Sequence, residues 1–211
     1  VANYSYNTSY IYNRSWNSVE WGQGYNAIFS GDKNLKTVTF EDGISEIISE
    51  LFRGTGINKI DLPSSVTKIG SAAFANSDLT TINLPSSLSE IQDFAFANTK
   101  LKEITIPDSV EKIGYGAFDS VETLDKVTLP ANLKEISSKT FYKTNIAKIT
   151  IPESVSSIGG IAFADTPLQS ITLPNNLISI GQNAFSGTQL TNVTLPSKLK
   201  TLETEAFGEI A

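Results

Sequence analysis

The feature that most constrains the fold of this chain is an internal repeat of 22 residues. Its coils begin at Leu35, Ile57, Leu79, Leu101, Leu124, Ile146, Leu168 and Leu190. The step is 22 residues everywhere except for 23 between Leu101 and Leu124, where the extra residue falls near Ser120 to Thr123. A repeat of roughly 20 to 50 residues is typical of solenoids, in which each unit buries its apolar side chains against its neighbours.

The repeat follows the template L-x-x-I-x-L-P-x-x-V-x-x-I-x-x-x-A-F, and its six apolar columns stay apolar in every coil. The last column is always phenylalanine: Phe52, Phe74, Phe96, Phe118, Phe141, Phe163, Phe185 and Phe207. Seven of the eight prolines share another column: Pro63, Pro85, Pro107, Pro130, Pro152, Pro174 and Pro196. Such regularity predicts one buried spine and coils of one length.

Each coil has the pattern of a short strand followed by turns. Segments such as Ile104-Thr105-Ile106 show the period of two that a strand requires. The proline that follows cannot donate a ladder hydrogen bond, so it ends each strand at the same place. We expect a second extended piece around Val110 to Ile113, and then a turn into a short helical or 3-10 segment at Gly-x-x-Ala-Phe. Stacked coils would pair their strands into a parallel sheet.

Composition argues against several classes of function. The chain has 16 Lys and Arg against 22 Asp and Glu, a net charge of −6, so nucleic acid and anionic membrane surfaces would be repelled. Cys, Met and His are absent, which removes disulfides, thiolate and imidazole metal ligands, and Cys- or His-based catalysis. No stretch reaches the roughly 18 consecutive apolar residues of a membrane span. We therefore expect no enzymatic activity, no cofactor, no bound metal and no nucleic-acid partner.

The repeat resembles the BspA-like class of leucine-rich repeats. The motif Leu-x-x-Ile-x-Leu-Pro-x-x-Val-x-x-Ile-Gly-x-x-Ala-Phe is best kept in Leu101 to Phe118 and Ile146 to Phe163, and the resemblance covers residues 35–211. It implies an α/β leucine-rich-repeat solenoid of about eight 22-residue coils. Short parallel strands would form one face, turns and short helical or 3-10 segments the other, with a cap at the N-terminus. One position after Phe, often Cys in relatives, is Ser77, Thr99, Thr144, Thr166 or Thr188 here.

Two parts are expected along the chain: a capping segment at residues 1–34 and the repeat domain at residues 35–211. The first part holds both tryptophans and five of the seven tyrosines, enough to cover the otherwise exposed face of the first coil. The chain begins at Val1 without a signal-like apolar region, so we expect its targeting and anchoring segments to lie elsewhere. Members of the resembled class are typically large secreted or surface-anchored bacterial proteins, which implies an extracellular or cell-surface location.

The first strand of each coil supplies one set of candidate binding residues. Its outward position between the two apolar residues reads Thr39, Asp61, Asn83, Thr105, Thr128, Thr150, Thr172 and Thr194. The candidates on this face are Thr105, Thr128, Thr150, Thr172, Lys126 and Lys148. Cross-strand pairing of threonines and an ordinary solvated surface are alternative explanations of the same pattern.

The aromatic N-terminal segment supplies a second set of candidates, Tyr12, Trp16 and Trp21. Exposed Tyr and Trp side chains stack on sugar rings or anchor protein partners because they combine apolar area with a polar tip. The alternative is that these rings form the core of the cap.

The sequence predicts a non-enzymatic, cell-surface or secreted binding module that mediates adhesion or protein-protein interaction through the solenoid surface. The resembled class implies adhesion to host or microbial surfaces and offers no catalytic set to carry over. The expected partner is a host or microbial surface protein or glycan, and the chain is expected to be monomeric without membrane insertion. Two alternatives are a structural spacer in a larger surface protein and a carbohydrate-binding module that uses the N-terminal aromatics.

Overall fold

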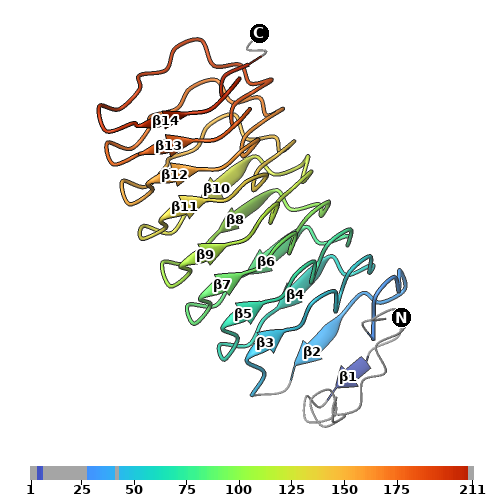
Figure 1. The fold of residues 1–211 in the computed structure, drawn as a ribbon. Helices are drawn as coiled ribbons and strands as arrows, with labels where there is room; N and C mark the ends of the chain where they lie inside the picture. The colour runs from blue at the N-terminus through green and yellow to red at the C-terminus, as the bar shows by residue number, and fades with distance from the viewer. Residues whose placement is uncertain (1–3, 7–27, 41–42, 209–211) are drawn as a thin grey trace, which may run out of the picture.

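The structure, a computed structural model, describes residues 28–40 and 43–208 and the backbone of Tyr4–Tyr6. These residues form an elongated stack of coils that runs from the blue N-terminal end to the red C-terminal end (Figure 1). The short strands of the coils lie in two rows along the stack, and every strand pairing is parallel. The predicted parallel-strand solenoid is confirmed.

The first row holds the strands that precede the proline column. They are β2 (Val38–Phe40), β4 (Lys59–Asp61), β6 (Thr81–Asn83), β8 (Glu103–Thr105) and β10 (Lys126–Thr128), with β1 (Tyr4–Tyr6) paired to β2. Pairing is in register, so that Ile60 lies opposite Ile82 and Val127 opposite Ile104. Further along, Lys148 and Ser170 form an isolated parallel bridge. Each template column therefore becomes a row of side chains along the stack.

The second row holds the extended pieces expected after the proline, each two residues long. They are β3 (Glu46–Ile47), β5 (Lys68–Ile69), β7 (Glu90–Ile91), β9 (Lys112–Ile113), β11 (Glu135–Ile136), β12 (Ser157–Ile158), β13 (Ser179–Ile180) and β14 (Thr201–Leu202). They form two four-stranded sheets, β3-β5-β7-β9 and β11-β12-β13-β14.

The break between these two sheets coincides with the 23-residue coil. Elsewhere in the row a backbone N–H joins successive coils, as where Gly70 donates to the carbonyl of Ile47 at 2.7 Å. At the break the Ser137 hydroxyl donates to the Ile113 carbonyl, also at 2.7 Å. A side chain thus replaces a ladder bond where the extra residue changes the register.

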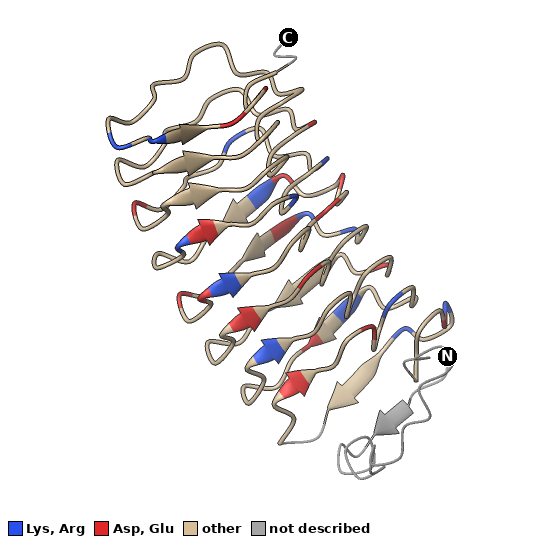
Figure 2. Cartoon of the chain, in the orientation of Figure 1, with Lys and Arg blue, Asp and Glu red and all other residues tan. Residues whose placement is uncertain are grey.

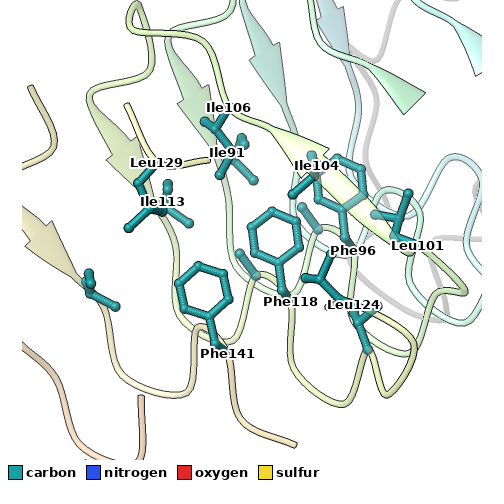
Figure 3. Packing of buried hydrophobic residues seen from close by; sticks show 14 of the residues in the cluster. Ile91, Phe96, Leu101, Ile104, Ile106, Ile113, Phe118, Leu124, Leu129 and Phe141 are labelled. Carbon is teal, nitrogen blue, oxygen red and sulfur yellow. The ribbon is translucent and has the colours of Figure 1, made fainter. Parts of the chain in front are cut away.

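The predicted phenylalanine spine forms the centre of the core. Rings of consecutive coils stack nearly parallel, with centroids 5.4 Å apart between Phe74 and Phe96 and 5.3 Å between Phe96 and Phe118. The row continues in the same way to Phe207. At the other end Phe29, which belongs to the predicted capping segment, stacks on Phe52 at 5.8 Å. Figure 3 shows the rings of three neighbouring coils in one row beside the buried aliphatic columns.

Buried hydroxyls follow the spine. Thr55, Thr99, Thr144 and Thr166 each donate a hydrogen bond of 2.7 to 2.9 Å to the carbonyl of the phenylalanine three residues earlier. Because this position lies inside the stack, an unpaired polar group there is costly. Ser77 occupies the same position, and its buried hydroxyl has no hydrogen-bond partner among the described residues.

The prediction of helical or 3-10 segments is wrong. The described residues form turns at these places. Around Phe52, alternate N–H groups donate to the next coil, as in Phe52 to the Ala73 carbonyl at 2.8 Å and Gly54 to Ala75 at 2.7 Å. The N–H of Arg53, between them, donates within its own coil. A helix needs its successive N–H groups to bond within the segment, so pairing between coils excludes it.

Left-handed residues also interrupt this segment in each coil. They lie two positions before and two positions after the spine phenylalanine, as with Ala72 at φ 53° and Asn76 at φ 59° around Phe74. An L-residue with positive φ does not continue a right-handed helix. The coil therefore closes through a series of tight turns.

The last coil differs from those inside the stack. Leu195 and Leu202, which occupy apolar columns, are 46% and 48% exposed, whereas the equivalent Leu173 and Ile180 are buried. Burial of a column depends on a coil on both sides, as the nearest-neighbour character of a solenoid requires. Val193, Leu199 and Phe207 of this coil are also only partly buried, whereas Leu190 stays buried.

Candidate functional site

The first-strand row brings the predicted threonines into one line. In β4, β6 and β8 the middle residue is buried and the two flanking residues are exposed. Thr105 and Thr128 are register partners, and both are exposed, as are Thr150 and Thr172 further along. Among the described residues, the hydroxyls of these four threonines have no hydrogen-bond partner. The hydroxyls are thus open to solvent or to a ligand, although Thr105 and Thr128 face each other as a cross-strand pair.

The two predicted lysines lie beside this line and differ in their partners. Lys126 is the register partner of Glu103, and its Nζ lies 3.4 Å from Oε2 of that carboxylate, both side chains being well exposed. Lys148 is exposed in the following coil and forms no ion pair with any residue in the described part of the chain. An exposed pair of this kind contributes little to stability, so both ammonium groups are available to an outside partner.

The three aromatic candidates Tyr12, Trp16 and Trp21 lie outside the described residues. Their role as binding residues therefore stays a prediction, and so does the alternative that they form the core of a cap. The described part of the capping segment contributes Phe29 to the core and an exposed Ile28.

The second-strand row carries charges of alternating sign. The residue before the buried isoleucine reads Glu46, Lys68, Glu90, Lys112 and Glu135 in five successive coils, and Figure 2 shows the alternation of red and blue along the row. Lys68 Nζ lies 3.2 Å from Glu46, and Lys112 Nζ lies 3.7 Å from Glu90. Opposite charges on neighbouring strands attract, so four of these five charged groups are paired within the row.

A shallow cleft of about 520 Å³ lies on the return segments of later coils. It is lined by Glu122, Lys143, Thr144, Asn145, Asp165, Thr166, Pro167, Gly187 and Gln189. A hydrogen bond with Tyr142 raises the pKa of Lys143, and the carboxylates of Asp165 and Glu122 act in the same direction. Glu122 belongs to the 23-residue coil, which is the one sequence signal that pointed to this region.

The return segments of earlier coils hold a closer ion pair. Lys100 Nζ lies 2.8 Å from Asp78 Oδ1, and this hydrogen bond holds the pKa of Asp78 below its ordinary value of 3.8. Such pairs join successive coils at the surface. They offer charged groups for contact with a partner, and they place no nucleophile beside a base.

Phe94 and Tyr115 form an exposed aromatic pair that the sequence analysis did not single out. Phe94 is 36% exposed and Tyr115 39% exposed, and their ring centroids lie 5.2 Å apart at an angle of 72°. They occupy turn positions that hold Ser71 and Ala72 in an earlier coil. The signal in the sequence is the appearance of aromatic residues at two turn positions that hold no aromatic residue in the other coils.

Within the described residues, no group of three or more acidic side chains is placed to hold a metal ion. No helix there is long and apolar enough to cross a membrane.

Comparison with known families gives one match over most of the chain. Residues 25–120 and 89–210 match the family described as BspA type leucine rich repeat region, with six copies of the repeat. No curated protein matches the chain. The matched range starts ahead of Leu35 and takes in Phe29, which stacks on the spine.

Several solved structures of bacterial leucine-rich repeat proteins are similar to this one. A protein from Bacteroides ovatus shares 30% identity with a TM-score of 0.62, over 69% of this chain and 45% of that one. A protein from Eubacterium ventriosum shares 22% identity with a TM-score of 0.72, over 88% of this chain and 55% of that one. A leucine rich cell surface protein from Faecalibacterium prausnitzii shares 20% identity with a TM-score of 0.50, over 87% and 67%. The chain spans about half the length of the first two.

Proposed function

Because this chain belongs to the BspA-type leucine-rich-repeat family, we propose that it is a non-enzymatic binding module, displayed outside a bacterial cell, that recognises a surface protein. The partner contacts the exposed face of the first-strand row. The name of the similar Faecalibacterium prausnitzii protein, a leucine rich cell surface protein, supports the location.

The observation that carries the proposal is the alternation of exposed and buried residues in the first strands. Each of β4, β6 and β8 buries its isoleucine and points the side chain on either side outward. Strands spaced about 4.8 Å apart repeat this over eight coils, which gives a face roughly 35 Å long. A specific protein interface buries about 800 Å² per partner, and a face of this length can supply that area.

Charge on this face supports a protein partner with acidic groups. Lys126 and Lys148 lie on successive coils, and Lys126 is neutralised only by the exposed Glu103. The hydroxyls of Thr128 and Thr150 lie beside them without internal partners. Ammonium groups with adjacent hydroxyls suit a carboxylate on the partner, because both donate hydrogen bonds to it.

Solid-phase binding of the full chain to matrix proteins, mucin and whole microbial cells tests the proposal. We expect saturable binding to at least one of them, and a loss of about tenfold or more when Lys126→Glu is combined with Lys148→Glu, because two favourable charge contacts become repulsive. The matched control combines Lys134→Glu with Lys200→Glu, which changes the net charge equally at exposed positions outside this face.

Two results would contradict the proposal. One is the absence of saturable binding to every surface tested. The other is equal binding by the two double variants, which is also what a purely structural spacer predicts.

A further inference from the structure

The exposure of Phe94 and Tyr115 is not caused by a position at the end of the stack. The other large apolar side chains that are exposed within the described residues are Ile28, Ile178, Leu195 and Leu202. Ile28 lies at the start of the described solenoid and the two leucines lie in its last described coil, whereas the coil of Ile178 has a neighbour on each side. The aromatic pair also lies between neighbouring coils, and its two rings contact each other. Its exposure is a property of these two residues.

A glycine, which has no side chain, lies beneath the pair. Gly116 follows Phe94 by one coil at the same turn position, and a Cβ on Gly116 would lie 2.7 Å from Phe94 Cε1. The Phe94 ring therefore lies over this glycine, with the Tyr115 ring at its edge. The three residues together make an exposed aromatic corner.

The backbone conformation at Phe94 is set by the fold, but the choice of side chain is not. Phe94 has φ 55°, and each coil has a left-handed residue at this position. Asparagine tolerates this region better than a bulky side chain does, and Asn183 occupies the equivalent position in a later coil. Stability alone would thus favour Asn or Gly over Phe at position 94.

Polar groups of both signs surround the corner. Asp93 Oδ1 accepts a hydrogen bond of 2.8 Å from the backbone N–H of Tyr115, which leaves the second carboxylate oxygen of Asp93 open. Asp119 borders Gly116, and its Oδ2 lies 3.9 Å from Lys139 Nζ. Lys139 Nζ also lies 5.2 Å from the centre of the Tyr142 ring. The residues beside the corner thus offer two carboxylates, Asp93 and Asp119, and one ammonium group, Lys139.

We propose that Phe94, Tyr115 and Gly116 form a subsite for a neutral glycan. A sugar ring presents C–H groups on its face, which pack on an aromatic ring, and hydroxyls at its edge, which both donate and accept hydrogen bonds. The aromatic corner supplies the apolar contact, and Asp93 and Lys139 supply an acceptor and a donor beside it. The excess of carboxylate over ammonium groups beside the rings disfavours an anionic ligand. Two partly exposed rings are too small for a protein interface of about 800 Å² per side.

Isothermal titration of the full chain with cellohexaose, mannohexaose and the hexamer of N-acetylglucosamine tests this subsite. We expect saturable binding of at least one, and about tenfold weaker binding in Phe94→Asn and in Tyr115→Ser, since an aromatic contact contributes up to about that factor. Both variants introduce residues that this chain already carries at the same turn positions, Asn183 and Ser71. The folded state of each variant is checked by its thermal midpoint.

The control is Ile161→Asn, which makes a comparable change at the same turn position two coils beyond Gly116 and leaves glycan binding unaltered. Binding of none of the three oligosaccharides, equal binding by the aromatic variants, or tighter binding of polygalacturonate would each overturn the assignment. The first-strand double variant is expected to bind glycan like the wild type, because its substitutions lie on another segment of the coil. Failure of the protein-binding proposal is thereby distinguishable from failure of this one.

Discussion

Replacing Phe118 by alanine is expected to destabilise the chain strongly, because the ring is buried between two others. Phe118 has no exposed surface, and its centroid lies 5.3 Å from Phe96 and 5.6 Å from Phe141, both nearly parallel to it. Truncation of a buried phenylalanine to alanine costs about 3 to 5 kcal/mol. The cavity would lie in the middle of the solenoid, where neither adjacent coil can move in to fill it. We expect a loss near the upper limit of that range.

The matched comparison is Phe207→Ala at the end of the spine. Phe207 stacks on Phe185 alone, at 5.1 Å, and is only partly buried. With one stacked neighbour and part of its surface already in water, the expected loss is about 2 kcal/mol. Urea unfolding followed by circular dichroism gives the free energy of unfolding of both variants. The dependence of the free energy of unfolding on urea concentration is expected to become less steep in Phe118→Ala but not in Phe207→Ala. A weakened central coil would let the two halves of the solenoid unfold separately.

Equal losses for the two variants would refute this reasoning. They would mean that stability does not depend on contacts between neighbouring coils. A loss below about 1 kcal/mol for Phe118→Ala would refute it as well, because the coil would then have relaxed around the cavity.

Three further perturbations test other parts of the stack. Ser77→Thr is expected to raise the free energy of unfolding by about 1 kcal/mol in urea titrations, because threonine at this position donates to a phenylalanine carbonyl and Ser77 has no partner. Lys112→Glu should lower the free energy of unfolding by up to about 1 kcal/mol by facing Glu90, and the loss should shrink in 1 M NaCl. Lys100→Gln should lower the thermal midpoint at pH 7, because Lys100 holds the pKa of Asp78 below its ordinary value. That contribution is present above the ordinary pKa of Asp78 and is lost as pH falls through the lowered value, so the midpoints of variant and wild type should converge in acid.

The core could be predicted from sequence because its burial follows a local rule repeated in each coil. The column that contains Phe118 is sufficient to place that ring inside the stack, and the same holds for Ile104 and Val110. The helical segment could not be predicted correctly, because its backbone bonds go to the next coil. Phe52 donates to Ala73, a residue 21 positions away, and no pattern within one coil reveals that pairing.

The candidate site was accessible to sequence reasoning only in part. A period of two places Thr105 and Thr128 outward, and they are exposed in register. The aromatic corner depends on contacts across two coils, in which Phe94 lies over Gly116 and meets Tyr115. Each of these residues occupies a variable position, and their proximity becomes visible only once the coils are stacked in register.

The alternating charges of the second-strand row have a consequence for how such a gene changes length. Tandem repeats gain and lose units by unequal recombination, and loss of one coil would preserve the apolar columns of this chain. It would also place Glu46 beside Glu90, or Lys68 beside Lys112, where opposite charges now meet. Loss of two adjacent coils, or about 44 residues, restores the original neighbours. In this stretch the unit that evolution can delete without penalty is therefore a pair of coils, twice the length of the unit that folds.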